Sequence, residues 1–188
     1  MDDPLARSCG RAVMGCSVSI KDADGTDLAR GEVGEVVVSG TNIMAGYWNK
    51  PEQTAAVLKH GGYYTGDMGY LDDDGYLFLV DRSKDMIVSG GENVYSTEVE
   101  EVLYRHPAVL EAAVFGVPDD KWGEAVYAVI VPRPENAEVQ PEELIAFCRE
   151  HIGGYKVPKG IDIQHEPLPK SGPGKVLKRE LRAPYWEG

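Results

Sequence analysis

The 188-residue sequence has few cysteines, few histidines and no long apolar run, and each scarcity excludes a class of protein. Its three cysteines are odd in number and lack Cys-x-x-Cys spacing, which argues against a disulfide framework and a structural zinc site. No apolar stretch approaches the roughly 20 residues that a membrane-spanning helix needs, and the first residues do not resemble a signal peptide. We therefore expect a cytoplasmic protein without a transmembrane segment, in which Cys9, Cys16 and Cys148 fill apolar space.

Basic residues are also scarce. The chain has 19 Lys and Arg against 31 Asp and Glu, which gives a formal net charge of -12. Such an acidic chain is not expected to bind nucleic acid or an anionic membrane. An anionic ligand such as a nucleotide would have to be held by a few placed cations and by backbone N–H groups.

The first part of the chain, which we place at 1–81, is rich in strand signals. An Asp-Gly turn signal at 24–25 lies between apolar runs, and a short helix is expected after Pro51. A hairpin is predicted around the acidic turn at 72–75, which lacks the glutamate of a calcium loop, so no metal site is expected. The predicted strands cover residues 12–14, 17–20, 34–38, 68–71 and 76–80.

The second part, 82–188, alternates between helix and strand patterns. Thr97 is a candidate N-cap for one helix, Pro141 begins another, and the basic segment 175–182 predicts a last one. Strands are predicted over 109–117, 125–131 and 161–163. Without repeats or low-complexity tracts, the pattern predicts two small domains.

Residues 64–67, Tyr-Thr-Gly-Asp, form the first stretch whose side chains could bind a ligand. A carboxylate fixed after a glycine turn, here Asp67, can accept hydrogen bonds from both hydroxyls of a ribose diol, and Arg82 could reach the same sugar. The simpler alternative is that Asp67 closes a turn and that Arg82 forms a surface ion pair with Asp81 or Asp85.

Residues 89–93, Ser-Gly-Gly-Glu-Asn, form the second stretch. Two adjacent glycines permit unusual dihedral angles and let a narrow ligand lie against the backbone. The spacing is not the dinucleotide-binding G-x-G-x-x-G pattern. A tight turn ahead of the next helix is the alternative interpretation.

The third stretch, Pro-Lys-Ser-Gly-Pro-Gly-Lys at 169–175, superficially resembles a phosphate loop. Pro169 and Val176 stand where that motif requires glycine and Ser or Thr, so the motif is absent. The stretch instead presents Lys175 on a glycine-flanked turn, where a cation could stabilise charge during attack of a carboxylate on a phosphate. Alternatively, Lys175 is a solvated surface residue.

In their order and spacing, these three stretches resemble the C-terminal portion of acyl-CoA synthetases of the AMP-binding, adenylate-forming family. Residues 31–36 and 44–48 look like the β-barrel portion of that family's large domain, and residues from about 82 onward look like its small mobile domain. The implied fold class is α+β: a β-rich remnant of the large adenylation domain, followed by a small α+β C-terminal domain.

The resemblance implies an acid-thiol ligase. Such enzymes join a fatty or other carboxylic acid to ATP, forming an acyl-adenylate and pyrophosphate, and then transfer the acyl group to the thiol of CoA. The implied substrates are a small-molecule acid, ATP and CoA, with Mg²⁺ expected to accompany ATP.

The resemblance also assigns roles to residues that match the family's motifs. Thr65, Asp67 and Arg82 match nucleotide-binding positions, with Asp67 on the ribose diol. Lys175 matches the lysine of adenylation, between the substrate carboxylate and the α-phosphate. Lys84 matches the hinge about which the small domain swings between the two half-reactions.

A second set of matched positions concerns CoA. Gly90, Gly91 and Glu92 match the loop that meets the pantetheine tunnel, and Trp122 matches a position beside the CoA nucleotide. One departure is Ser96, which stands where the family commonly has proline and which can itself cap a helix.

A larger departure is that the family's Ser/Thr/Gly-rich triphosphate loop and the segments lining the acyl pocket have no counterpart in this chain. We therefore expect the chain to be inactive alone and to need a missing N-terminal portion, by which Mg²⁺ would mainly be bound. We also expect it to expose apolar surface that could drive self-association. Two alternatives stay open: part of an adenylation domain that loads a carrier protein, and a non-catalytic module that binds a nucleotide or a partner.

Overall fold

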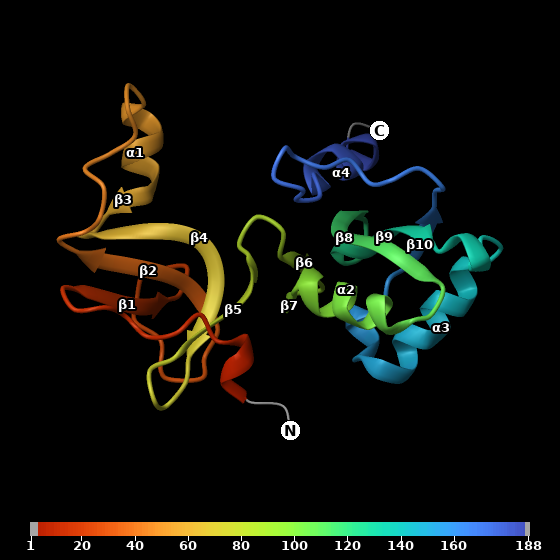
Figure 1. Cartoon of the computed structure of the whole chain (residues 1–188), viewed down its shortest axis with the longest axis horizontal. Helices are drawn as coiled ribbons and strands as arrows, with labels where there is room; N and C mark the ends of the chain where they lie inside the picture. Colours follow the sequence, from red (N-terminus) through yellow and green to blue (C-terminus); the bar gives the residue numbers. More distant parts are fainter. Residues whose placement is uncertain (1–3, 187–188) are drawn as a thin grey trace. The chain divides into compact units, whose positions relative to one another are not determined.

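The computed structural model describes residues 4–186 and contains two compact units that divide between Lys84 and Asp85 (Figure 1). The expected α+β class is confirmed: the first unit is mostly sheet, and the second combines a sheet with helices. No helix within 4–186 is long and apolar enough to cross a bilayer.

The first unit is built on one antiparallel sheet in the order β1-β2-β4-β3, with β5 also paired to β4. Its small core contains Ile20, Val36, Val37 and Tyr64, all nearly inaccessible to solvent. The predicted hairpin is confirmed, since β4 and β5 pair around the turn at 72–75. The elements are 3₁₀ helix η1 (Pro4–Arg7), β1 (Cys16–Lys21), β2 (Gly34–Gly40), α1 (Pro51–Val57), β3 (Leu58–Lys59), β4 (Gly62–Leu71) and β5 (Leu77–Arg82).

The strand predicted over residues 12–14 is wrong. The segment leads into a turn at Gly15, whose φ of +82° is a left-handed conformation, and β1 begins only at Cys16. Val13 and Met14 are exposed, so their apolar character does not reflect a buried strand.

The second unit has a mixed sheet in the order β10-β9-β6-β7, with β8 also paired to β9. β10 runs parallel to β9, whereas the other pairs are antiparallel. The elements are β6 (Ile87–Ser89), β7 (Glu92–Val94), α2 (Ser96–Arg105), β8 (Val109–Asp119), β9 (Gly123–Pro132), η2 (Pro134–Asn136), α3 (Pro141–His151), η3 (Gly154–Lys156), β10 (Gly160–Ile163) and α4 (Lys178–Trp186).

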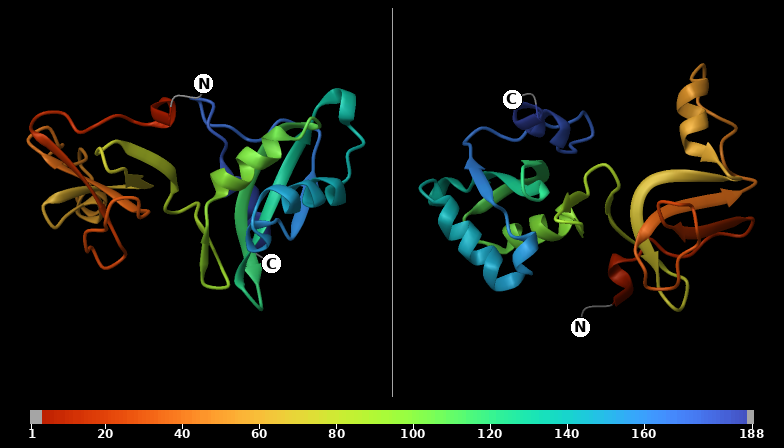
Figure 2. Two further views of the ribbon diagram at one scale, coloured as in Figure 1. Left: turned by 90° about the horizontal axis from the view of Figure 1, so that it is seen from below. Right: turned by 180° about the vertical axis from the view of Figure 1, so that it is seen from behind.

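Helices cover both faces of this sheet (Figures 1 and 2). Alternate residues of β8 point to opposite faces, so Ala112 and Val114 pack with α2 and α3, while Ala113 and Phe115 pack beneath α4. Leu144 and Cys148 of α3 are fully buried against the sheet. Cys148 fills apolar space as expected, and burial raises the pKa of its thiol to about 11, whereas Cys9 is exposed and does not fill such space.

Two helix boundaries differ from prediction. α2 begins at Ser96 with Tyr95 as its N-cap residue, so Thr97 is not the cap. Ser96 is fully buried, and its hydroxyl accepts a hydrogen bond from Lys178 Nζ at 2.6 Å. α4 begins at Lys178 and not at Lys175, because the preceding residues form a turn.

Lys178 anchors α4 to α2 through a largely buried ion pair. Its ammonium lies 2.7 Å from Glu100 Oε1, and the two side chains are 14% and 15% exposed. Glu100 Oε1 also accepts a hydrogen bond from the backbone N–H of Val114 at 2.8 Å. The carboxylate therefore connects α2, α4 and β8.

Replacing Glu100 by Gln is expected to lower the free energy of unfolding by about 3 kcal/mol, since it leaves a buried ammonium without its counter-charge. Urea denaturation measures the change. The matched substitution Glu150→Gln, at an exposed position of α3, should leave the midpoint unchanged. Equal midpoints for both variants would contradict the structural role of the pair.

Candidate functional site

Residues 65–67 lie in a bulge inside β4, so the predicted turn at this place is wrong. Val37 of β2 pairs with Tyr64 and Glu35 pairs with Met68, which leaves one residue of β2 opposite the three residues 65–67. Gly66 takes a φ of +73°, which favours glycine. Bulges of this kind redirect side chains and are common beside functional sites.

Two side chains replace the backbone bonds that the bulge interrupts. The Thr65 hydroxyl donates to Val36 O at 2.9 Å and accepts from Asp67 N at 3.1 Å. The Glu35 carboxylate accepts from Gly66 N at 3.1 Å. Thr65 and Glu35 therefore fix the backbone that presents Asp67, and Glu35 was not predicted as a site residue.

Asp67 and Arg82 face each other across β4 and β5. They are partners in the strand register, and Arg82 Nε lies 2.8 Å from Asp67 Oδ1. The side chains are 28% and 49% exposed, so both stay accessible to a ligand. The Arg82 guanidinium thus pairs with Asp67, whereas the Asp81 carboxylate accepts from the backbone N–H of Arg82 at 2.7 Å.

Gly90 and Gly91 form the two-residue loop of the β6–β7 hairpin. Their φ values of +62° and +87° are those of a type I′ turn, in which Ser89 pairs with Glu92. Gly90 N donates to Trp122 O at 2.8 Å, and a Cβ on Gly90 would come within 2.7 Å of the indole. The structure thus brings Gly90 and Trp122, two predicted site residues that lie far apart in the sequence, into direct contact.

Trp122 lies on the turn between β8 and β9. The Asp119 carboxylate holds this turn by accepting from the backbone N–H groups of Lys121 and Trp122, both at 2.9 Å. Trp122 is 39% exposed, with Lys121 Nζ 4.5 Å and Lys159 Nζ 6.0 Å from the centre of its ring. The site therefore pairs an accessible aromatic face with two cations that sequence analysis did not identify.

Gly90→Ala is expected to displace Trp122, whereas Gly91→Ala is not. Both substitutions place a Cβ at a positive φ, but only the one at position 90 meets the indole; the one at position 91 meets nothing within 4 Å. The NMR resonance of the Trp122 indole N–H, assigned with Trp122→Phe, should shift strongly in the first variant. Equal shifts in the two variants would contradict the packing.

Lys175 lies on a closed turn, and its side chain is exposed. Lys170 and Val176 form an antiparallel bridge at its base. Ser171 N donates to Lys175 O at 2.8 Å, and Lys175 N donates to Ser171 Oγ at 3.2 Å. Gly174, with a φ of +87°, reverses the chain. The lysine backbone thus has a defined conformation.

The predicted site residues form one set in each unit. Asp67 and Arg82 belong to the first unit, which ends at Lys84, and Lys175 and the glycine hairpin belong to the second. Within residues 4–186, no group of His, Cys, Asp and Glu side chains is arranged to hold a metal ion.

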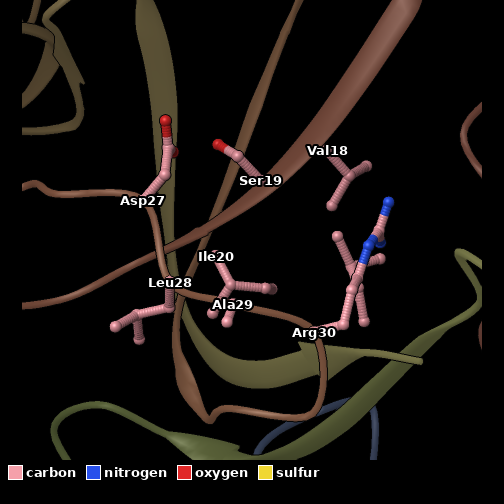
Figure 3. Close-up of a pocket in the computed structure, with 8 residues that line it drawn as sticks. Val18, Ser19, Ile20, Asp27, Leu28, Ala29 and Arg30 are labelled. Atoms are coloured by element: carbon pink, nitrogen blue, oxygen red, sulfur yellow. The ribbon is translucent and has the colours of Figure 1, made fainter. Parts of the chain in front are cut away.

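A pocket of about 280 Å³ in the first unit contains none of the predicted site residues. Figure 3 shows Asp27 and Arg30 on either side of its apolar lining. It is lined by Val18, Ser19, Ile20, Asp27, Leu28, Ala29, Arg30 and Leu71.

Comparison with known proteins places these features in a family context. The family model for the AMP-binding enzyme C-terminal domain matches residues 98–175, and the model for AMP-binding enzymes matches residues 1–48. A feruloyl-CoA synthase from Amycolatopsis is 48% identical over 165 residues, which cover 88% of this chain and 33% of the relative. A long-chain-fatty-acid–CoA ligase from Bacillus subtilis is 51% identical over 150 residues, 80% of this chain and 26% of the relative.

Solved structures show the same partial coverage. The crystal structure of ATP-bound MatB from Rhodopseudomonas palustris superposes with a TM-score of 0.88 and 34% identity, over 98% of this chain and 37% of that one. The chain thus spans about a third of the length of the proteins it matches.

Proposed function

The chain belongs to the family of AMP-binding, adenylate-forming enzymes, and we propose that it acts as the C-terminal part of an ATP-dependent acyl-CoA ligase. The complete enzyme would convert a carboxylic acid, ATP and CoA to acyl-CoA, AMP and pyrophosphate. The observation that carries the proposal is the fixed, accessible pair of Asp67 and Arg82 in the β4 bulge.

Asp67 is proposed to accept hydrogen bonds from the two ribose hydroxyls of the nucleotide. A carboxylate has enough acceptor sites to keep Arg82 and still bind a diol, and such charge-assisted bonds are stronger than neutral ones. Arg82 would hold the carboxylate in place and approach the same sugar. Thr65 would act through the backbone of the bulge, since its hydroxyl already bonds Val36 O and Asp67 N.

Lys175 is proposed to stabilise the negative charge that develops as the substrate carboxylate attacks the α-phosphate. Its exposed ammonium on a closed turn supports this role. Mg²⁺ would accompany ATP and be held mainly by the portion of the enzyme that carries the triphosphate loop.

The glycine hairpin and Trp122 are proposed to bind CoA. Gly90, Gly91 and Glu92 would lie against the narrow pantetheine arm. The exposed indole could stack on the adenine, while Lys121 and Lys159 supply positive charge for the phosphates. The second unit would thus serve the thioester step as well as adenylation.

Residues 1–81 are proposed to be the β-rich end of the large domain and residues 82–188 the small mobile domain, with Lys84 as the hinge between half-reactions; the two compact units divide three residues after this boundary. The unit boundary directly after Lys84 supports this assignment. We also propose that the protein is cytoplasmic and that it requires the N-terminal portion of the enzyme. Exposed apolar residues such as Trp48 would mediate self-association.

A hybrid enzyme tests the function. The segment of the Bacillus subtilis long-chain-fatty-acid–CoA ligase that this chain matches is replaced by the chain itself. The hybrid should release pyrophosphate in the presence of acid and ATP, and should form acyl-CoA when CoA is added. A folded hybrid that binds ATP but catalyses neither step would contradict the proposal.

A further inference from the structure

Glu111 of β8 lies on the same face of the sheet as α4 because of a local irregularity. The register between β8 and β9 shifts at this point: Val109 pairs with Pro132, but Glu111 pairs with Val131, so Leu110 is an extra residue. From Glu111 onward, alternate residues point towards α4, where Ala113 and Phe115 are buried. The carboxylate thus lies at the edge of an apolar cluster.

Both oxygens of Glu111 bind the segment that precedes the Lys175 turn. Oε1 lies 2.6 Å from Lys170 Nζ, and Oε2 accepts from Leu168 N at 3.1 Å. The Glu111 side chain is only 20% exposed. The hydrogen bond from Lys170 lowers the pKa of the Glu111 carboxyl, with a further contribution from the Leu168 N–H, against the opposing effect of burial.

The turn that carries Lys175 is attached to the sheet at both ends. Before the turn, Leu168 is buried in the cluster beneath α4, at 2% exposure, and Lys170 is held by Glu111. After the turn, Val176 packs against the same cluster and bridges Lys170. Glu111 therefore provides the polar anchor of the segment that precedes the turn.

We propose that Glu111 is a positioning residue for Lys175: by holding Lys170 and the Leu168 N–H, it fixes the turn that presents the lysine for adenylation. The proposal rests on the function proposed above for Lys175. A catalytic cation works only when it is held close to its productive position, and displacement by about 1 Å can cost up to 10²-fold in rate.

Amide hydrogen exchange on the 188-residue chain tests the anchoring without any activity. The N–H groups of Ser171, Gly174 and Leu177 are hydrogen-bonded within or beside the turn. Glu111→Gln, which keeps the shape of the side chain but removes its charge, should accelerate their exchange about 10-fold relative to Glu150→Gln. Unchanged exchange at the turn, or an equal increase across β9, would overturn the proposal.

The hybrid enzyme tests the catalytic consequence. Glu111→Gln should slow adenylate formation about 10-fold and leave thioester formation from supplied acyl-adenylate unchanged. Lys170→Arg should retain most of the rate, because it keeps the ion pair, whereas Lys170→Met should behave like Glu111→Gln. A looser turn with normal adenylation would overturn the positioning role.

The two arms separate this inference from the proposed function. If the hybrid without further substitution is inactive, the proposed function fails, and the exchange experiment still decides whether Glu111 anchors the turn. If the hybrid is active but the Glu111 variant matches it in both half-reactions, only the positioning role fails.

Discussion

Lys175→Ala in the hybrid enzyme is expected to slow formation of the acyl-adenylate by about 10²–10³-fold. The attack of a carboxylate on the α-phosphate brings two anionic groups together, and charge accumulates on the phosphate oxygens in the transition state. An ammonium group placed there stabilises the transition state more than the ground state. Pyrophosphate release in a single turnover measures this step directly.

Thioester formation provides the internal control for Lys175. When acyl-adenylate and CoA are supplied, the Lys175→Ala enzyme should form acyl-CoA at nearly the normal rate, because the adenylating charge is no longer needed. Lys50→Ala, which removes an exposed lysine in the first unit, should affect neither step. Equal losses in both half-reactions for Lys175→Ala would count against a role confined to adenylation.

Asp67→Ala in the same enzyme is expected to raise the KM for ATP by about 10²-fold. The substitution removes two hydrogen bonds to a charged acceptor, each worth roughly 1.5–3 kcal/mol, and leaves Arg82 without its partner. Steady-state kinetics with ATP and with 2′-deoxy-ATP measure the effect. The parent hybrid should prefer ATP, and the variant should lose this preference.

The choice of nucleotide makes this test specific for the ribose. Asp74→Ala, on the acidic turn between β4 and β5, removes the same charge at a position outside the proposed site and should keep both the KM and the preference. If Asp67→Ala weakens ATP binding but still prefers ATP over 2′-deoxy-ATP to the same degree, Asp67 does not contact the sugar.

Much of the fold could be predicted because its signals are local. Helix periodicity from Pro141, the strands on either side of Trp122 and the acidic turn at 72–75 all appear where the sequence predicts them. The strand wrongly predicted at 12–14 also rests on a local signal. A short apolar run before Gly15 is typical of a strand, although this segment lies outside the sheet.

The details of the site depend on partners far along the chain, which local patterns do not indicate. The bulge that presents Asp67 is held by Glu35, 31 positions away. Glu111 binds Lys170 at a separation of 59 positions, and Gly90 meets Trp122 only because two hairpins pack together. The sequence indicated residue types suited to the chemistry, and the tertiary structure shows which residues support them.

A crystal structure of the hybrid enzyme with AMP bound would decide whether Asp67 holds the ribose. We expect the Asp67 carboxylate to lie within hydrogen-bonding distance, about 2.5–3.0 Å, of both ribose hydroxyls, with Arg82 still bonded to it. A nucleotide whose ribose contacts other residues, with Asp67 bound only to Arg82, would show that Asp67 does not bind the sugar.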